Sequence, residues 1–494
     1  PSRTNWKIGP GMWPIGLVKL HHTFWCRVHN NNYAVVVGRM NSKRNSRIMS
    51  EYIQSLSRPP PNLLYPIQFA VSVMARTGQV AVFTVPIAVM ILLHTVTEVP
   101  SDTFLYSLIT KQMAFLNGAF IKLAQWMSTR PDRLPDGLCQ ALSRLQSNAP
   151  SHSVEYTRYV VNTKHPELRD KLVISDQVIG SGTIGQVHVG EYNGIKVAVK
   201  VLHPDIESRV NVDLTIIGAM VRLLSFMTPF DLNDEYTRFK VMLKQQLDLR
   251  HEGHAMERFH RHFMYSKRVQ FPRVYYMGRD VLVEELIEGT PMQMFIATCN
   301  DSVWRRNVAV TGLRTLVRMM LKDNLVHADM HPGNLIVTGR GLHDYKLAII
   351  DTGLVCELSK ADHVNFKLLF YALIIQRSGS AVARLILDRI PQPFIQNRAG
   401  FINDMAKAID PIIQDQFRFT TMSVGDAVTG VMGIVRRYRV RLDPSFTNLI
   451  WAGVVVEGVG RQLVPQDLPL LPVFVEASLR FLVTEGIAEI IDRT

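Results

Sequence analysis

The residues that could do chemistry in this chain begin with a G-x-G-x-x-G-x-V loop that leads into a V-A-V-K strand. Gly180, Gly182 and Gly185 carry no Cβ, so the backbone of such a loop can lie close over phosphate groups and offer its amides. Val187 would pack on the adenine side, and Lys200 would supply a positive charge for the α- and β-phosphates. This spacing predicts an ATP site of the kind found in kinases.

A glycine triplet alone is weak evidence, because similar spacing occurs in ordinary β-turns and in dinucleotide-binding Rossmann folds. In a Rossmann fold a helix follows the glycines. Here Gln186, His188 and Gly190 alternate with Val187 and Val189, which is the period of a strand. The local pattern therefore favours the kinase interpretation.

Further along the chain, polar residues recur with the spacing of a kinase catalytic loop. Asp329 stands five residues before Asn334, and Asp351 ends the apolar run of LAIIDTG, which is the position of the metal-binding aspartate of D-F-G. Thr352 replaces the aromatic residue of that motif. We expect Asp329 to act as the general base or to orient water, and Asn334 and Asp351 to bind Mg²⁺.

Each of these residues also has a structural interpretation. Asp329 and Asn334 could brace a turn, and Lys200 could be a solvated strand lysine. His327, Asp329 and His331 are also arranged like zinc ligands, with two imidazoles close to a carboxylate. The P-G-N turn that follows, and the lack of a Cys or His cluster elsewhere in the sequence, favour the kinase geometry.

The octapeptide from His327 to Asn334 resembles the hallmark H-A-D-x-H-P-G-N of the UbiB-type (aarF-domain) atypical kinases, a family associated with ubiquinone biosynthesis. The stretch from Phe120 to Asp132 resembles the K-x-G-Q element of this family, and 455–465 resembles its C-terminal stretch. The similarity spans about residues 105–465. It implies an α+β, bilobal protein-kinase-like fold with an N-terminal helical extension and a largely helical C-lobe.

The resemblance also implies how the nucleotide would be positioned. Glu252 would pair with Lys200. The strand 281–286 would lead into the hinge between the lobes, where the backbone around Glu285 would hydrogen-bond adenine. ATP and Mg²⁺ are therefore the expected ligands.

A further set of implied residues lies in the K-x-G-Q and E-x-D elements. A helix carrying Lys122 and Gln125 would fold over the active site and obstruct protein substrates. Lys122 would be held by Gln246 and Asp248. Ala124 replaces the glycine of K-x-G-Q, which removes access to positive φ at a predicted turn. Gln246 replaces a carboxylate, so the lock on Lys122 would depend on Asp248.

Another departure concerns activity. Most of the family carries an alanine-rich loop, which the resemblance implies restrains kinase-type activity, whereas Gly180, Gly182 and Gly185 restore the ordinary kinase pattern. No A-P-E motif follows Asp351, so the segment with which protein kinases dock peptides is missing or remodelled. The chain therefore resembles a divergent branch of the family. The resemblance supports an ATP site in this chain more strongly than it supports any particular physiological substrate.

Composition indicates a globular chain. Its 494 residues, 47% hydrophobic and 20% charged, suffice for two lobes and an appended helical region. We expect a basic arm at 1–58, a helical extension at 59–168, an N-lobe at 169–288 and a C-lobe at 289–494. One long helix is predicted from Asp234 to His262. The four cysteines form no C-x-x-C pair, which indicates a reducing compartment.

The start of the chain is strongly basic. Residues 1–58 hold nine Lys or Arg and one acidic residue, Glu51, so nine minus one leaves +8 of the total charge of +13 in this arm. Three interpretations stay open. The arm could be a mitochondrial presequence, a disordered solvated tail, or a segment that binds nucleic acid or anionic lipid.

An apolar segment follows the basic arm. From Thr77 to Thr97 there is no charged residue, and this length suffices to cross a bilayer, although Pro86 and His94 interrupt the apolar run. The alternative is a helix buried under the kinase lobes. Membrane association is common in the family that the chain resembles, which favours a membrane-anchored or membrane-apposed protein.

Two classes of function follow from these features. In the first, the protein is a mitochondrial Mg²⁺-dependent ATPase or a kinase for a small or lipid-like substrate, linked to quinone or lipid metabolism and associated with the inner membrane. In the second, it is a kinase-like scaffold or assembly factor whose basic arm docks to a ribonucleoprotein or another large mitochondrial complex.

Overall fold

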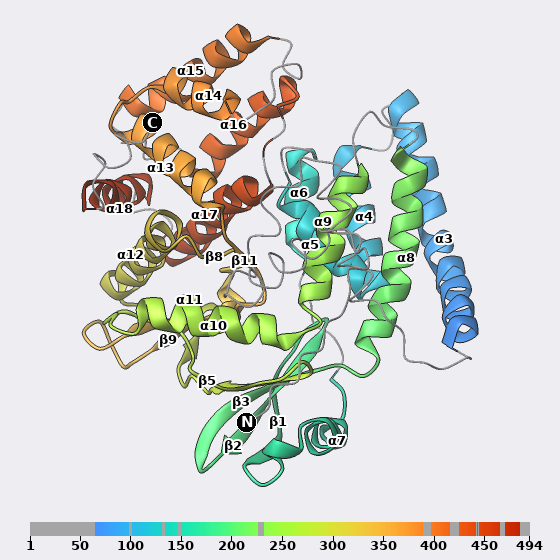
Figure 1. The fold of residues 1–494 in the computed structure, drawn as a ribbon. Coiled ribbons are helices and arrows are strands. Elements are labelled where there is room, and N and C mark those ends of the chain that lie inside the picture. The colour runs from blue at the N-terminus through green and yellow to red at the C-terminus, as the bar shows by residue number, and fades with distance from the viewer. Residues whose placement is uncertain are drawn as a thin grey trace, which may run out of the picture.

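The computed structural model describes residues 65–97, 101–130, 134–145, 151–225, 232–388, 397–414, 424–440, 442, 444–464 and 470–484. The predicted basic arm at 1–58 lies outside these residues. The described chain has a first lobe built on an antiparallel sheet, a second lobe that is mostly helical, and a helical extension beside them (Figure 1). The predicted α+β, bilobal kinase-like fold is confirmed.

The N-terminal extension is helical, as predicted. Its elements are α3 (Tyr65–Thr97), α4 (Asp102–Leu116), α5 (Ala119–Ser128), α6 (Asp136–Ser143), α7 (Val154–Lys164) and the 3₁₀ turn η2 (Pro166–Leu168). Ser153 caps α7 by accepting a hydrogen bond from the N–H of Tyr156. Asn117 and Gly118 both have φ of 55°, so the chain turns sharply between α4 and α5.

The first lobe contains a five-stranded antiparallel sheet in the order β1-β2-β3-β6-β5. Its elements are β1 (Leu172–Ser181), β2 (Gly185–Tyr192), β3 (Ile195–Leu202), α8 (Ile206–Ser225), α9 (Leu232–Gln245), α10 (Leu249–Phe263), β5 (Val274–Met277) and β6 (Val281–Glu285). Alternate valines of β3 and β6 pack with valines of α7, as the period of a strand requires. Because a strand follows the glycine loop, the Rossmann alternative is wrong.

The single helix predicted from Asp234 to His262 is also wrong. The chain leaves α9 after Gln245 and enters α10 at Leu249. Asp248 separates them, because its carboxylate accepts a hydrogen bond from the N–H of Arg250 and so caps a new helix. Figure 1 shows that α10 consequently runs in a different direction from α9, beneath the second lobe.

The second lobe is largely helical. Its elements are β4 (Val269–Gln270), β7 (Thr290–Pro291), α11 (Met292–Thr298), α12 (Ser302–Arg318), the π-helical turn η3 (Met319–Asp323), β8 (Val326–His327), the 3₁₀ turn η4 (Pro332–Asn334), β9 (Leu335–Thr338), β10 (Lys346–Ile349), β11 (Val355–Cys356), α13 (Lys360–Ile374), α14 (Gly379–Leu387), α15 (Arg398–Gln414), α16 (Val424–Arg437), α17 (Pro444–Leu463) and α18 (Leu470–Thr484). Small sheets, β4-β10-β9-β7 and β11-β8, carry the loops that lie between the lobes.

The core of the second lobe holds α10 in place. Met256, Phe259 and Phe263 of α10 are buried in a cluster with residues of α12, β9 and β10. Phe259 stacks on Phe271 with ring centroids 4.7 Å apart. The first turn of α10 is therefore supported by a packed helix that contacts both lobes.

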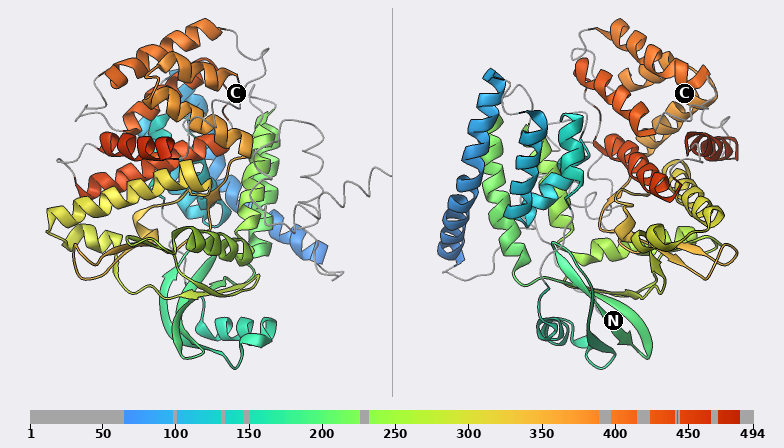
Figure 2. Two further views of the ribbon diagram at one scale, coloured as in Figure 1. Left: turned by 60° about the vertical axis from the view of Figure 1, so that its left-hand side comes forward. Right: turned by 180° about the vertical axis from the view of Figure 1, so that it is seen from behind.

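The apolar helix α3 lies on the outside of the molecule beside α8 (Figure 2). Val80 of α3 is buried in a cluster with residues of α8, whereas Val71, Val82 and Val85 are more than half exposed. The alternative of a helix buried under the kinase lobes is therefore wrong. By length and composition, the segment Pro66–Ile91 could cross a membrane.

Candidate active site

Three segments that are far apart in the sequence meet at Lys200. Its Nζ lies 2.6 Å from Oε1 of Glu252 and 3.1 Å from Oδ2 of Asp351. Lys200 comes from β3, Glu252 from the first turn of α10, and Asp351 from the residues that follow β10. The site therefore joins the sheet of the first lobe, the helix between the lobes and a loop of the second lobe.

Burial and charge act against each other at these three groups. Burial disfavours the charge of Lys200, but Asp351 and Glu252 outweigh it and raise the pKa of the amine. Burial also opposes the charge of Asp351, yet Lys200 and the N–H of Gly353 hold the pKa of this carboxyl well below its usual range. Burial raises the pKa of Glu252 to about 7, against the attraction of Lys200. The amine and Asp351 are thus charged at neutral pH.

The strand register places Lys200 beside the residues expected at a nucleotide. In the sheet, Lys200 is opposite Val187 on β2 and opposite Leu282 on β6. Val187 was predicted to contact adenine, and it lies next to the lysine across the strand pair. Gly185 pairs with Leu202, so the glycine loop lies beside the end of β3, two residues beyond Lys200.

The glycine loop is a hairpin between β1 and β2. The N–H of Gly182 donates to the carbonyl of Gly185 across 2.9 Å. A Cβ on Gly185 would lie 2.6 Å from the carbonyl oxygen of Val201, so the fold itself requires glycine there. A Cβ on Gly180 would meet nothing within 4 Å, and one on Gly182 would meet only Gly185 O, at 3.7 Å. Contacts within the fold therefore do not require glycine at these two positions.

The catalytic-loop residues are held by backbone hydrogen bonds. Nδ1 of the buried His327 accepts from the N–H of Asp329 across 3.1 Å, and Nε2 donates to the carbonyl of Asp351. Asn334 donates from Nδ2 to the carbonyl of Asp329 across 2.9 Å. The carboxylate of Asp329 is half-exposed. Because both ring nitrogens of His327 bond to the backbone, the zinc interpretation of this loop is wrong.

Asp351, the predicted metal-binding aspartate, is followed by a threonine that replaces the aromatic residue of D-F-G. Thr352 is 1% exposed, and its Oγ1 donates to the carbonyl of Glu252 across 3.0 Å. The N–H of Gly353 donates to Oδ1 of Asp351 across 2.8 Å. These bonds fix the Asp351 loop against the start of α10.

The oxygen donors of this loop fit magnesium better than a softer metal. Mg²⁺ is usually held by one or two protein carboxylates or amides together with phosphate oxygens and water. Asp351 and the Oδ1 of Asn334 offer such oxygens. Within the described part of the chain, no group of three or more His, Cys, Asp and Glu side chains gathers as a metal site. Asn334 and Asp351 would therefore hold Mg²⁺ together with a nucleotide.

The residues around the hinge differ from the sequence expectation in one respect. The N–H of Glu285 donates to the carbonyl of Arg273 across 2.8 Å, so this donor is already engaged. The Glu285 carboxylate accepts from Gln270 and from the N–H of Arg273. Adenine would have to use other backbone atoms of the hinge, such as the carbonyl of Glu285.

Sequence reasoning missed Glu284, the preceding residue on β6. Its side chain is 6% exposed, and its Oε2 has no hydrogen-bond partner. Burial, together with the negative charge of Glu252, raises the pKa of Glu284 well above its ordinary value of 4.5. The signal was an acidic residue at the end of the apolar run of V-L-V-E-E. A second buried carboxyl group, besides that of Glu252, thus lies close to Lys200.

The E-x-D-like residues contact other partners than the resemblance implied. The carboxylate of Asp248 pairs with Nη2 of Arg250 across 2.6 Å. Gln246 donates from Nε2 to the carbonyl of Gly353 across 3.5 Å, and its Oε1 is buried without a partner. Lys122 lies close enough to lower the pKa of Glu252, although burial dominates at that group. The lock on Lys122 by Gln246 and Asp248 stays a prediction.

The K-x-G-Q-like residues lie on α5. Gln125 donates from Nε2 to the carbonyl of Leu145 across 3.2 Å. Ala124 is fully buried inside α5, where it packs with Leu138 and Leu142 of α6. The turn expected at Ala124 is therefore absent from α5, and the extra methyl group fills a helix contact instead.

Two comparisons identify relatives of the chain. Residues 144–385 match the ABC1 atypical kinase-like domain, and residues 405–466 match the UbiB helical domain. An ABC1 family protein of Saccharomyces cerevisiae, named as mitochondrial, is 28% identical and aligns over 77% of this chain and 69% of that protein. A probable protein kinase UbiB of Tolumonas auensis is 27% identical over 71% of this chain and 66% of its own length.

A solved structure was also found. The Mycobacterium tuberculosis protein Rv3197, in a complex with erythromycin, is 19% identical with a TM-score of 0.44, covering 73% of this chain and 94% of that chain. Together the two matched domains extend from the segment before α7 through α17 and include Lys200, Asp329 and Asp351. The chain belongs to the ABC1, or UbiB-type, family of atypical kinase-like proteins.

Proposed function

We propose that this protein is a mitochondrial enzyme that binds ATP with Mg²⁺ and either hydrolyses it or transfers its γ-phosphoryl group to a small or lipid-like acceptor. The observation that supports this most directly is the contact of Lys200 with both Glu252 and Asp351, at 2.6 and 3.1 Å. A cation between a helix carboxylate and a metal-binding carboxylate is the arrangement that phosphoryl-transfer enzymes of the kinase type require.

Each side chain then has a role that its position supports. Lys200 binds phosphate oxygens, and Glu252 orients the amine. Asn334 and Asp351 would hold Mg²⁺, which would supply positive charge to neutralise the phosphates. The half-exposed Asp329 accepts a proton from the acceptor or orients water.

The acceptor is proposed to be small or lipid-like and connected to quinone or lipid metabolism. The described residues after Asp351 form the β11 strand and then α13, with no A-P-E motif in the sequence. The relative from Saccharomyces cerevisiae is named as mitochondrial, and the relative from Tolumonas auensis is named UbiB. The exposed apolar face of α3 supports contact with the inner membrane.

The test is a thermal-shift and turnover assay of the full chain with ATP in the presence and absence of Mg²⁺. We expect Mg²⁺-ATP to raise the Tm of the native protein. Asp351→Asn should lose most of the Mg²⁺-dependent part of this shift, and Lys200→Ala most of the nucleotide-dependent part. Lys196→Ala, an exposed strand lysine that pairs with Glu288, is the matched control. Unchanged stabilisation and turnover in both site variants would reject the assignment.

The alternative is a kinase-like scaffold that binds nucleotide as a structural ligand. A scaffold would show the rise in Tm with Mg²⁺-ATP but no turnover. Asp329→Asn would then leave the rise in Tm unchanged, and turnover would stay absent. The basic arm at 1–58 would supply the docking segment. Partner binding that falls steeply with salt, and is lost when residues 1–58 are removed, would favour this alternative.

A further inference from the structure

Three histidine side chains and a threonine hydroxyl form a continuous chain of polar contacts that ends at the glycine loop. Nε2 of His203 lies 2.8 Å from the carbonyl oxygen of Gly182, and its Nδ1 lies 2.7 Å from Nδ1 of His152. Nε2 of His152 lies 2.9 Å from Oγ1 of Thr157, and this oxygen lies 2.9 Å from Nε2 of His188. These four contacts, called here the histidine network, connect the glycine loop with α7 and β2.

Both ends of the histidine network can only accept a hydrogen bond. One end is the carbonyl of Gly182. At the other end, the amide nitrogen of Gln186 lies 2.7 Å from Nε2 of His188, and an amide nitrogen can only donate. The orientation of this amide is fixed, because Gln186 Oε1 accepts from the N–H of His152 across 2.8 Å and Nε2 donates to the carbonyl of His152 across 3.0 Å. Nε2 of His188 is therefore an acceptor.

The histidine network lacks one hydrogen when its imidazoles are neutral. Each of the four contacts needs one hydrogen, whereas neutral His203, neutral His152 and Thr157 supply one each, which makes three. At one contact two lone pairs would then face each other. One added proton, shared by His152 and His203, supplies the fourth hydrogen. All four distances are those of hydrogen bonds, so the structure has the geometry of the protonated network.

His203 also holds the glycine loop through its backbone. Its N–H donates to the carbonyl of Ile184 across 2.9 Å, so this residue bonds to two carbonyls of the loop. His203 follows Lys200 by three residues, just after the end of β3. The position of the loop relative to Lys200 therefore depends on the contacts of His203.

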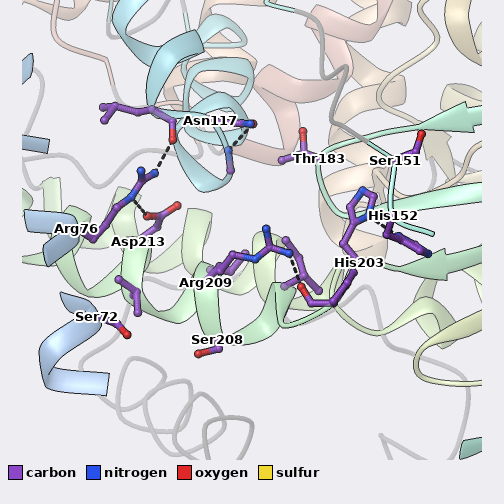
Figure 3. A pocket seen from close by; sticks show the side chains of 16 residues that line it. Ser72, Arg76, Asn117, Ser151, His152, Thr183, His203, Ser208, Arg209 and Asp213 are labelled. Carbon is purple, nitrogen blue, oxygen red and sulfur yellow. Dashed lines mark hydrogen bonds and ion pairs between the residues drawn. The ribbon is translucent and has the colours of Figure 1, made fainter. Parts of the chain in front are cut away.

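Solvent reaches the network from one side. His152 and His203 lie at the edge of a cavity of about 570 Å³ that extends toward α8 and α3 (Figure 3). His152 is half-buried, so water in this cavity can exchange a proton with its ring. Lys200 and Asp351 do not line the cavity, and the network is thus protonated from outside the nucleotide site.

Burial opposes the added proton. Burial, together with the neighbouring imidazoles, lowers the pKa of His152 to about 4, and burial lowers the pKa of His203 and of His188 as well. Completion of the four hydrogen bonds favours the proton. Negative charge of a nucleotide under the glycine loop would also favour it. Among the described residues, the other titratable or charged groups that face the network are Tyr156 and Arg158 of α7, Asp176 of β1 and Arg209 of α8.

We propose that His152 and His203 are positioning residues for the glycine loop, and that one proton shared by their imidazoles completes the histidine network and fixes the loop. The effect on nucleotide rests on the proposed function, because it requires that the loop cover the phosphates. Protonation of the network and binding of nucleotide then support each other.

Thermal unfolding of the full chain without nucleotide, from pH 7.5 to pH 4.5, tests the shared proton. Acidification lowers the Tm, because the pKa of His152 in the folded chain lies below its ordinary value of 6.5. Thr157→Val leaves two contacts for two N–H groups, so it should cost little Tm at pH 7.5. The native network favours the proton and the variant does not. The Tm deficit of Thr157→Val should therefore grow by roughly 2 °C as the pH falls.

Two further variants show whether the hydroxyl causes this growth. Thr157→Ser keeps the hydroxyl, so any Tm deficit of this variant should stay constant with pH. Thr315→Val is the matched control, because Thr315 is also buried in a helix and bonds to the carbonyl of Thr311 across 2.7 Å, away from the histidines. Its deficit should also be constant. If the valine variant does not fold, Thr157→Ala, which also lacks the hydroxyl, replaces it. A deficit that does not grow in the variant without the hydroxyl would overturn the shared proton.

Calorimetric titration with Mg²⁺-ADP tests the link to the nucleotide site. Between pH 7.5 and pH 5.5, the affinity of the native protein should rise about threefold relative to that of Thr157→Val. Glu252 and Glu284 are present in both proteins, so their titration cancels from this ratio. A ratio that is the same at both pH values would overturn the coupling between the network and the loop. A chain with the expected Tm pattern that does not bind Mg²⁺-ADP would contradict the proposed function and leave the shared proton intact.

Discussion

The hydroxyl of Thr352 donates a hydrogen bond to the backbone carbonyl of Glu252 across 3.0 Å. In D-F-G motifs an aromatic side chain packs at this position. Here a buried polar bond instead connects the residue after Asp351 with the residue that pairs with Lys200. The position of α10 and the position of the Asp351 loop are therefore coupled by a contact that requires a hydroxyl.

Thr352→Val should remove this hydrogen bond and keep the packing around it, because valine has the shape of threonine without the hydroxyl. The carbonyl of Glu252 loses its donor in a buried site, so we expect a loss of about 1 to 2 kcal/mol in the free energy of unfolding, measured by chemical denaturation. Thr237→Val serves as the control, since Thr237 bonds to the carbonyl of Asn233 on the exposed face of α9. Equal effects of the two substitutions would contradict the coupling.

The glycine loop offers a matched pair of substitutions. Gly185→Ala places a Cβ 2.6 Å from the carbonyl oxygen of Val201, and we expect it to destabilise the protein by about 2 kcal/mol. Gly182→Ala has room in the folded chain and should leave the Tm nearly unchanged. If phosphates lie under this loop, Gly182→Ala will weaken the Mg²⁺-ATP shift without unfolding the protein. A large fall in Tm for Gly182→Ala would show that the loop packs differently.

The buried carboxyl of Glu284 predicts a pH dependence of stability. Its pKa in the folded chain is raised above its ordinary value of 4.5, chiefly by burial, so its contribution is fully present below pH 4.5 and is lost as pH rises through the folded pKa. Glutamine does not titrate. Glu284→Gln should therefore gain Tm relative to the native protein between pH 5 and pH 8, by roughly 2 °C or more.

A thermal-unfolding series over this pH range checks the sign. Glu288→Gln is the control, because Glu288 is 72% exposed where it pairs with Lys196. Its difference from the native protein should be flat with pH. Glu252, whose pKa is about 7, contributes the same trend to the native protein and to Glu288→Gln and cancels from that comparison. A Glu284→Gln protein that loses Tm relative to the native chain as pH rises would contradict a buried neutral carboxyl.

A buried arginine attaches the K-x-G-Q-like helix to the first lobe. Arg130, just after α5, is 2% exposed and bonds to both carboxylate oxygens of Glu235 on α9, at 2.5 and 3.2 Å. Glu235→Ala leaves a buried cation without this partner, so we expect a loss of about 3 kcal/mol in unfolding free energy. Glu207→Ala, which removes an exposed partner of Arg279, should change stability by less than about 1 kcal/mol.

The sequence predicted the fold and the family, because these depend on short motifs with fixed spacing. The bilobal fold and the family are confirmed, and the structure brings Lys200 to Glu252 and Asp351. The helix break before Asp248 was missed, although an aspartate followed by a helical pattern is a recognisable capping signal. The apolar periodicity concealed the break, because it continues from one helix into the next. Phe239 and Leu243 of α9 and Leu249 of α10 are all buried.

The contacts that were missed depend on tertiary register. Glu284 lies beside the site only because β6 pairs with β3 in the register that sets Ala198 opposite Glu284. His152 and His203 meet only because the chain before α7 lies beside the end of β3. Such relationships join segments with no common motif, so spacing along the chain could not reveal them.

The amine of Lys200 serves two carboxylates with one positive charge. A divalent cation bound to Asp351 would weaken the attraction between Asp351 and Lys200. The amine could then bind a triphosphate while it keeps its contact with Glu252. Nucleotide arriving without metal would instead compete with Asp351 for the amine and meet its negative charge. If ATP and Mg²⁺ bind as proposed, the charges of the unoccupied site disfavour ATP without metal, and metal and nucleotide should bind with positive cooperativity.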